Sequence, residues 1–218
     1  MKGALLELVA RGNEDMYLIG NPKYSYFKSV YRTHTNFSKF ESRNEFLSGY
    51  GFGKKAICQI DKKGDLLTGS LLVLKLPETG NSLVSWINGV GNYIIKNVAL
   101  KIGGETISEM SGEYIDIFYK YYLAEGHYST YSEMIKKISG YRENSLITEQ
   151  DVFVPLPFWF CKELSQALPL ISIGYHDITI EIEFRSLTDC LYSTNDKSGL
   201  GALVDLNNLE IVDAYIYN

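Results

Sequence analysis

Few residues of this 218-residue chain have the types and spacing that catalysis or metal binding requires. The histidines are His34, His127 and His176. They form neither H-x-H nor H-x-x-x-H, the short spacings at which two imidazoles reach one metal ion. The cysteines are Cys58, Cys161 and Cys190. Their odd number and the lack of C-x-x-C spacing favour reduced thiols over a zinc site or a disulfide framework. We therefore expect no metal and no cofactor.

Two other motifs are compatible with chemistry, but each also has a simpler structural explanation. Glu181 and Glu183 share one face of a predicted strand, as a two-carboxylate hydrolase would require, yet alternating acids are also the normal wet face of an amphipathic strand. GYGFGK at 49–54 resembles a phosphate loop, but Lys55 stands where a Walker A motif needs Ser or Thr. No G-x-S-x-G nucleophile motif occurs. The sequence therefore predicts that the protein is not an enzyme.

The segment GNPKYSYFKSVYRTHTNF, residues 20–37, carries three cations, Lys23, Lys28 and Arg32, among five aromatic rings and no acid. This composition suits a nucleic-acid-binding arm, a piece of core or a protein-binding surface. The formal net charge of the whole chain is -5, which argues against a surface that tracks phosphates. With 17 tyrosines against 2 tryptophans, the aromatic content favours protein interfaces.

The elements that would position these residues are mostly strands. In DITIEIEF, residues 177–184, apolar and polar residues alternate as in a strand with one wet face. Residues 94–102, the turn Gly103-Gly104 and the ETI that follows predict a hairpin. Residues 55–61 and 66–76 are also β-rich, and the KKGD between them predicts that they pair antiparallel.

Helices are expected only in the connections between strands. Residues 113–126 form the best candidate, with Ser111 as N-cap and Gly126 at the far end. Apolar side chains cover nearly all sides of this helix, so we expect it to be packed around most of its circumference. Residues 132–138 are expected to form a second short helix.

The remaining patterns complete an all-β chain. Three prolines within residues 151–170 predict a strand end that leads into a buried bend, and residues 209–218 predict a last strand. We expect an antiparallel jelly-roll β-sandwich with short helices in inter-strand insertions. Residues 1–40 are expected to be an N-terminal segment leading into the first strand, and residues 41–218 a single jelly-roll domain.

The order of these motifs resembles a known family. ELVARGNEDMYLIGNP at 7–22 and FKSVYRTHTNF at 27–37 are followed by FGKK at 52–55 and GDL at 64–66. IIKNVALKIGGETI at 94–107, EYIDIF at 113–118 and VPLPFWFCKELSQALPLISIGYHDITI at 154–180 continue in the same order. Together they resemble the major capsid proteins of nucleocytoplasmic large DNA viruses, the group that contains phycodnaviruses, iridoviruses and mimivirus-like viruses. The resemblance extends from about residue 4 to the end of the chain.

The resemblance implies a structural capsid protein that self-assembles through subunit edges into capsomers of an icosahedral shell. If the parent chain carries a second jelly roll, the resemblance implies a trimer, and the end of this sequence inside a strand favours this alternative. A single jelly roll would imply a pentamer or a hexamer. The implied partners are other capsid proteins and an internal viral membrane or minor capsid proteins, with no specific nucleic acid. The implied location is the virion capsid, after assembly in the host cytoplasm. The alternative is a jelly-roll carbohydrate-binding module that binds glycan with loop tyrosines, Trp86 or aspartates.

The subunit contacts are expected in the N-terminal segment and in the predicted helix. The interface candidates are Tyr24, Tyr26, Phe27, Tyr31, Arg32, Tyr119, Tyr121 and Tyr122. Lys23, Lys28 and Arg32 are expected on the inner face of the shell, where anionic lipid headgroups or acidic partner proteins would meet them.

Overall fold

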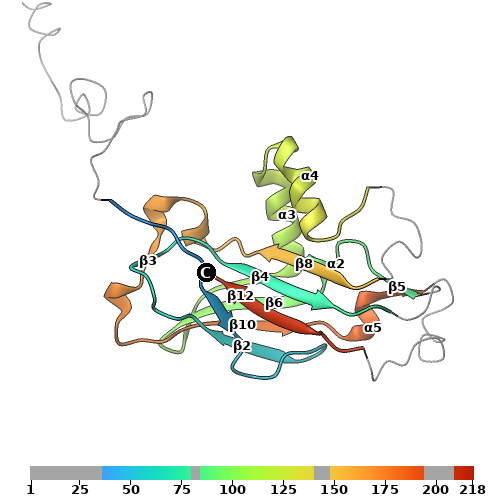
Figure 1. Cartoon of the computed structure of the whole chain (residues 1–218), viewed down its shortest axis with the longest axis horizontal. Coiled ribbons are helices and arrows are strands. Elements are labelled where there is room, and N and C mark those ends of the chain that lie inside the picture. The colour runs from blue at the N-terminus through green and yellow to red at the C-terminus, as the bar shows by residue number, and fades with distance from the viewer. Residues whose placement is uncertain (1–35, 80–83, 140–147, 194–208) are drawn as a thin grey trace, which may run out of the picture. The chain divides into compact units, whose positions relative to one another are not determined.

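Two antiparallel sheets organise the chain, and the computed structural model describes residues 36–79, 84–139, 148–193 and 209–218. The first sheet contains β1 (Arg43–Glu45), β4 (Leu71–Leu76), β8 (Gln150–Pro155) and β12 (Asp213–Tyr217). The second sheet contains β2 (Lys55–Gln59), β6 (Ile95–Ile102), β7 (Glu105–Ser111) and β10 (Ile178–Phe184). Figure 1 shows the two layers, with β4 and β12 in front of β2, β6 and β10.

The strand order is that of a jelly roll. Within the described ranges the first sheet runs β1-β12-β4-β8 and the second β2-β10-β6-β7, and every pairing in them is antiparallel. The chain crosses between the sheets after β1, β2, β4, β7, β8 and β10, so neighbours in a sheet are mostly distant in sequence. The connections between these strands form two further short strand pairs. β3 (Leu66–Leu67) pairs with β9 (Leu168–Pro169), and β5 (Val84–Trp86) pairs with β11 (Leu191–Ser193). The predicted all-β sandwich is confirmed.

Alternation along the strands builds the core. In β10 every second residue, Ile178, Ile180, Ile182 and Phe184, is buried, as the pattern of residues 177–184 predicts. From the first sheet Leu72 and Leu74 are fully buried as well. Each such side chain stabilises the fold by about 1.5–3 kcal/mol relative to its exposed state. Burial between the two sheets therefore holds the sandwich together.

The predicted β6–β7 hairpin is confirmed, and its turn explains the two glycines. Gly103 has φ 61° and Gly104 has φ 91°. Positive φ at both central residues is what a tight hairpin turn demands, and glycine adopts it without a steric penalty. The pairing then continues from Ile102 with Glu105 to Asn97 with Ser111.

The predicted pairing of residues 55–61 with residues 66–76 is wrong. β2 pairs with β10, whereas β4 pairs with β12 and β8 in the other sheet. β3 and β4 are separate strands, because the chain leaves β3 at Leu67 and enters β4 only at Leu71. Both β2 and β4 have a strongly apolar face, and these faces are buried when the strands lie on opposite sides of one core.

The described helices are short and lie in the connections. They are α2 (Val90–Tyr93), α3 (Gly112–Tyr122), α4 (Glu125–Met134) and α5 (Leu187–Cys190), with 3-10 turns η2 (Trp159–Cys161), η3 (Leu164–Gln166) and η4 (Ile171–Ile173). α3 and α4 lie in the long connection between β7 and β8 and project from the sandwich in Figure 1. We call α3 and α4 together the helical insertion.

Three details of the helix predictions are wrong. The first helix ends at Tyr122, because Leu123 and Ala124 are extended, and Gly126 lies inside α4 instead of terminating α3. The second helix begins at Glu125 and ends at Met134, ahead of Lys136, which has φ 59°. α3 is not packed around most of its circumference in this chain, since Gly112 and Ile115 are its buried residues.

The connection after β8 is the buried bend that its prolines predict. β8 ends at Pro155, and Phe158 and Phe160 then stack at 5.4 Å between ring centroids with both side chains fully buried. The last strand is shorter than residues 209–218, since β12 covers Asp213–Tyr217. Proline cannot donate to a central ladder, so the strand ends where the run of prolines begins.

Residues 41–218 form one compact unit, and Met1–Phe40 form a separate one. The sheets and helices given above all belong to the unit of residues 41–218. None of the helices in the described ranges is long and apolar enough to cross a membrane.

Candidate functional site

The helical insertion is anchored where α3 starts, directly after β7. Ser111 Oγ accepts a hydrogen bond from the backbone N–H of Tyr114 at 3.3 Å, which confirms the predicted N-cap. Glu113 in the first turn pairs with Arg185, which follows β10. The pKa of Glu113 lies below its ordinary value because its own backbone N–H, Ser111 and Arg185 favour the carboxylate, against the opposing effect of burial. These contacts attach the insertion to the second sheet.

Two glycines let the insertion approach the backbone of α2. A Cβ on Gly112 would lie less than 3.0 Å from the carbonyl oxygens of Asn92 and Ile95. A Cβ on Gly91 would lie 3.0 Å from the Cα of Ile135, the residue that follows α4, and 2.7 Å from a methyl group of Val152 in β8. Only glycine fits such close backbone contacts. The position of the insertion is therefore determined by backbone packing as well as by side chains.

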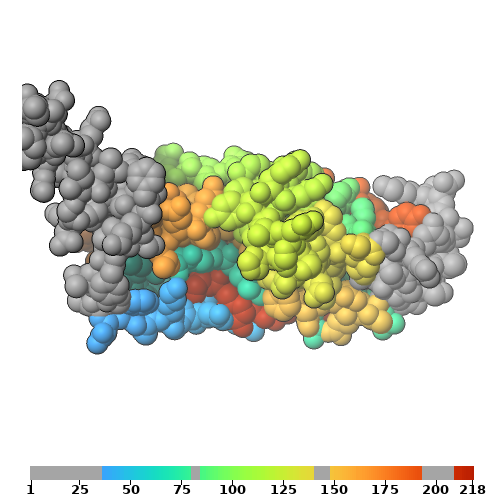
Figure 2. All heavy atoms as spheres, turned by 90° about the horizontal axis from the view of Figure 1, so that it is seen from above, coloured from blue at the N-terminus to red at the C-terminus, as the bar shows by residue number. Residues whose placement is uncertain are grey.

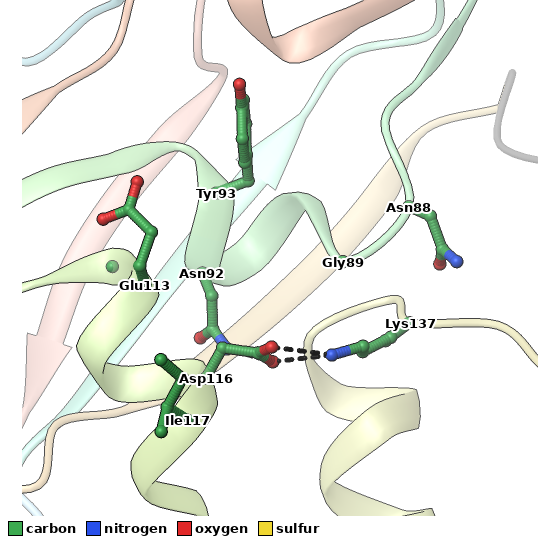
Figure 3. A pocket seen from close by; sticks show the side chains of 9 residues that line it. Asn88, Gly89, Asn92, Tyr93, Glu113, Asp116, Ile117 and Lys137 are labelled. Carbon is green, nitrogen blue, oxygen red and sulfur yellow. Dashed lines mark hydrogen bonds and ion pairs between the residues drawn. The ribbon is translucent and has the colours of Figure 1, made fainter. Parts of the chain in front are cut away.

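A pocket of about 200 Å³ lies between α2, the start of α3 and the residue Lys137 after α4 (Figure 3). Lys137 Nζ contacts both carboxylate oxygens of Asp116, at 2.9 and 2.7 Å. The side-chain amide of Asn92 donates to Asp116 at 3.2 Å and to the hydroxyl of Tyr131 at 2.7 Å. These ion-pair and hydrogen-bond contacts therefore attach α4 to α3 and α2. The pocket is thus part of the anchor of the insertion.

An exposed stripe of large apolar side chains runs along α3. Its residues are Tyr114, Ile117, Tyr121 and Tyr122, and we call them the α3 stripe. Tyr121 is 81% exposed and Ile117 56% exposed. In Figure 2 the yellow-green insertion rises on the face seen from above, beside the orange atoms of the connection between β8 and β10. The two segments also meet at Phe118, whose ring lies 4.9 Å from Lys162 Nζ. Exposed aromatic clusters on a rigid support are typical of protein interfaces.

The residues predicted for subunit contacts are distributed unevenly. Tyr121 and Tyr122 lie in the α3 stripe, whereas Tyr119 points to the other side of the helix and packs on Tyr131 with ring centroids 4.6 Å apart. Burial of Tyr119 raises its pKa. The other predicted contacts lie outside the described residues: Lys23, Tyr24, Tyr26, Phe27, Lys28, Tyr31 and Arg32.

Sequence reasoning missed Tyr114 and Ile117 as members of the stripe. Ile117 was counted among the apolar residues expected to pack around the helix, and Tyr114 was not singled out. The spacing of Tyr114, Ile117 and Tyr121 at intervals of three and four residues places them on one face. That periodicity was a usable signal, but only the structure shows that this face is exposed and that Ile115 faces the core.

The two strand carboxylates belong to a network of ion pairs on the outer face of the second sheet. Glu181 contacts Lys55 at 2.5 Å and Lys101 at 2.9 Å, and Glu183 contacts Lys96 at 2.5 Å. Burial opposes ionisation of Glu181, but hydrogen bonds from the two lysines outweigh it, so the pKa of Glu181 lies below its ordinary value. This arrangement is the wet face of an amphipathic strand with each acid paired to a lysine.

We expect the Glu181→Gln variant to be less stable than the wild type at pH 7, by about 1 kcal/mol or less. Because the folded-state pKa of Glu181 is depressed, its stabilising contribution is present above the unfolded-state pKa and is lost as pH falls through the folded-state value. Urea unfolding from pH 7 down to about pH 3 should therefore show the two free energies converging. Glu105→Gln on exposed β7 is the control. A difference that persists at low pH would contradict the prediction.

The other residues considered for catalysis or metal binding make contacts that support the fold. Lys62 Nζ donates to the carbonyl oxygen of His176 at 2.7 Å, and the ring of His176 lies against Gly103. Gly53 has φ 69° two residues before β2 begins, which suits a bend into a strand. Burial raises the pKa of the Cys58 thiol to about 12. Across the described ranges, no three His, Cys, Asp or Glu side chains gather closely enough to hold a metal ion.

The carbohydrate-binding alternative is not supported. Trp86, the expected stacking residue, is fully buried in β5, where its ring stacks on Phe52 at 5.8 Å. Its indole N–H donates to the carbonyl oxygen of Pro77 at 3.1 Å. A glycan-binding ring must be open to solvent on one face, so Trp86 is a core residue in this fold.

Comparison with known proteins gives a consistent result over nearly the whole chain. A family model described as "Major capsid protein N-terminus" matches residues 25–217. The major capsid protein of Phaeocystis pouchetii virus is 31% identical over 245 residues, which cover 99% of this chain and 46% of that protein. Capsid protein 1 of Acanthamoeba polyphaga mimivirus is 33% identical over 239 residues, covering 100% of this chain and 39% of that protein.

Solved structures show the same fold. PBCV-1 VP54, fitted into a reconstruction of the virophage Sputnik, superposes with a TM-score of 0.69 at 23% identity, over 88% of this chain and 44% of that one. A quasi-atomic model of the PBCV-1 virus capsid gives a TM-score of 0.68 at 24% identity. The chain thus spans less than half the length of these relatives.

Proposed function

Because this chain belongs to the major capsid protein family, whose N-terminal model it matches over residues 25–217, we propose that it is a structural protein of a viral capsid. In this proposal it self-assembles through its edges into capsomers of an icosahedral shell and catalyses no reaction. Its relatives from Phaeocystis pouchetii virus and mimivirus are named as capsid proteins. The large DNA viruses are the group in which those relatives occur.

The observation that carries the proposal is the α3 stripe on its anchored support. A soluble monomer rarely leaves several large apolar side chains together in water. Here they lie on a helix that is fixed to the sandwich by Gly112, the Glu113–Arg185 pair and the Asp116–Lys137 pair. A surface that is rigid before binding loses less entropy on association. The stripe is therefore suited to a repeated contact between subunits.

The finer features are part of the same proposal. A trimer is proposed if the natural chain carries a second jelly roll, and a pentamer or a hexamer if it carries one. Other capsid proteins, and an internal membrane or minor capsid proteins, are the proposed partners in the virion, after assembly in the host cytoplasm. The proposed parts are an N-terminal segment, residues 1–40, and a jelly-roll domain, residues 41–218. Tyr24, Tyr26, Phe27, Tyr31 and Arg32 remain proposed subunit contacts, as do Tyr119, Tyr121 and Tyr122.

The test is the double variant Ile117→Glu with Tyr121→Glu. Both side chains are exposed, so the variant should fold, while two buried charges at an interface should weaken self-association by at least about tenfold. Sedimentation across a concentration series measures the association, electron microscopy identifies rings or shells, and circular dichroism checks the fold.

The matched control is Ile107→Glu with Tyr175→Glu, which places the same charges on exposed residues of β7 and of the turn before β10. It should associate like the wild type. If the wild type shows no association at any concentration, the capsid proposal fails. If the wild type associates and the α3 variant does so equally well, the stripe is not the contact.

A further inference from the structure

The outer faces of the two sheets differ in character. On the second sheet the outward side chains include Lys55, Lys101 and Glu181, which form ion pairs. On the first sheet the outward side chains of the two central strands, β12 and β4, and of β8 are largely apolar. The apolar outward residues of β12, β4 and β8 are Tyr215, Tyr217, Leu71, Val73, Phe153 and Pro155. We call this surface the outer face of the first sheet.

The register places these side chains in rows across three strands. Tyr215 pairs with Val73, and Val73 pairs with Phe153 on the next strand. The aromatic neighbours cover Val73 so well that it is 4% exposed, although no second layer lies over it in the described chain. Tyr215 and Tyr217 contact each other edge to face at 5.1 Å. An apolar centre of this kind is the usual core of a protein interface.

Charged residues surround this apolar centre, and acids predominate. The acids are Glu45, Glu149, Asp151 and Asp213, and the cations are Arg43 and Lys75. Arg43 lies over the ring of Tyr215 at 3.8 Å and contacts Glu45 and Asp213, and Lys75 contacts Glu149. Four carboxylates against two cations leave a net negative rim. A complementary partner would carry aromatic or aliphatic side chains flanked by cations.

One segment of this sequence has that composition. Residues 20–37 contain five aromatic rings and three cations, Lys23, Lys28 and Arg32, with no acid. The segment precedes β1, which is an edge strand of the first sheet among the described residues. Phe40, between the segment and β1, is 58% exposed.

Building on the proposed capsid function, we propose that the acid-rimmed outer face of the first sheet receives the basic aromatic segment of residues 23–32 from a neighbouring copy. Its rings cover Tyr215, Val73 and Phe153, and its cations meet the acidic rim. Each copy then donates a segment and accepts one. Such a head-to-tail contact generates a ring when the rotation between copies closes, which is the form of assembly a capsomer needs.

The test is a charge exchange in the full chain. The segment variant carries Lys23→Glu, Lys28→Glu and Arg32→Glu, and the face variant carries Glu45→Lys, Glu149→Lys and Asp151→Lys. All three acids are exposed, so the face variant should fold. Each variant alone should self-associate at least about tenfold more weakly than the wild type. An equimolar mixture of the two should regain association, because each variant segment then finds an oppositely charged face.

A control with the same change in charge carries Glu105→Lys, Glu125→Lys and Glu133→Lys, on exposed residues of β7 and α4, and should associate normally. Weakening by the segment variant alone, with an unaffected face variant, would mean that the segment meets another partner such as anionic lipid, and it would overturn the inference. A mixture that stays dissociated would overturn it too, because exchange between copies is then absent. A wild type that never associates would instead refute the capsid function itself.

Discussion

The Gly112→Ala variant is expected to lose about 3 kcal/mol of folding free energy although it adds a single methyl group. That methyl group would lie within 3.0 Å of the carbonyl oxygens of Asn92 and Ile95. Both atoms belong to the backbone, at α2 and at the start of β6, so neither can rotate away as a side chain would. Relief requires moving α3 as a whole, which strains the Ser111 cap and the Glu113–Arg185 pair. Urea unfolding of both proteins measures the loss.

The matched control is Gly126→Ala. Gly126 lies in α4, and no atom stands within 4 Å of the position its Cβ would take. Alanine there should stabilise the protein by about 0.5–1 kcal/mol, because glycine is the poorer helix former. If both variants behaved alike, the close approach at Gly112 would not determine the position of α3. We also expect Gly112→Ala to associate more weakly than the wild type, since the α3 stripe depends on the same anchor.

The Trp86→Ala variant should be the most destabilised of the large-to-small changes, by about 3–5 kcal/mol. Trp86 is fully buried, stacks on Phe52 and donates its indole N–H to the carbonyl oxygen of Pro77. Truncation removes the apolar contacts, opens a cavity and leaves the partly buried carbonyl oxygen of Pro77 without its donor. Thermal and denaturant unfolding give the magnitude. Trp86→Phe should lose less, because it keeps most of the ring.

The second tryptophan provides the comparison. Trp159 is partly exposed and packs edge to face on Phe160 at 5.3 Å. Its replacement by alanine should cost about 1 kcal/mol. The chain has 2 tryptophans, so the fluorescence of each alanine variant comes from the remaining tryptophan. In Trp159→Ala, Trp86 should emit as a buried indole. An equal loss from the two substitutions would mean that Trp86 is not a core residue and would reopen the glycan-binding interpretation.

Local features were readable from the sequence because they depend on neighbouring residues. The alternation of residues 177–184 identified β10 and its buried face, and Gly103-Gly104 identified a hairpin turn that needs positive φ. The Ser111 cap is equally local, since its hydroxyl bonds a backbone N–H three residues later. The motif order likewise led to the capsid family without knowledge of any contact.

The errors concern partners that are distant in sequence. Nothing in residues 55–76 distinguishes a hairpin from two strands on opposite sheets, and that choice depends on β10 and β12, more than a hundred residues away. The predicted end of α3 was wrong because glycine often terminates helices, which pointed to Gly126. The helix ends earlier, where Leu123 and Ala124 are extended.

The candidate site divides in the same way. Residue types alone identified the aromatic helix and the basic segment of residues 20–37 as binding material, because ring content and charge are properties of composition. Whether a ring faces water is a property of packing. Tyr119 and Tyr121 are two residues apart, yet one packs on Tyr131 and the other is 81% exposed. The apolar outer face of the first sheet arises only when β4, β8 and β12 align, since each contributes two side chains to it. Short-range patterns thus specify elements and their chemistry, while long-range strand pairing determines which of those side chains are left on the surface for another subunit.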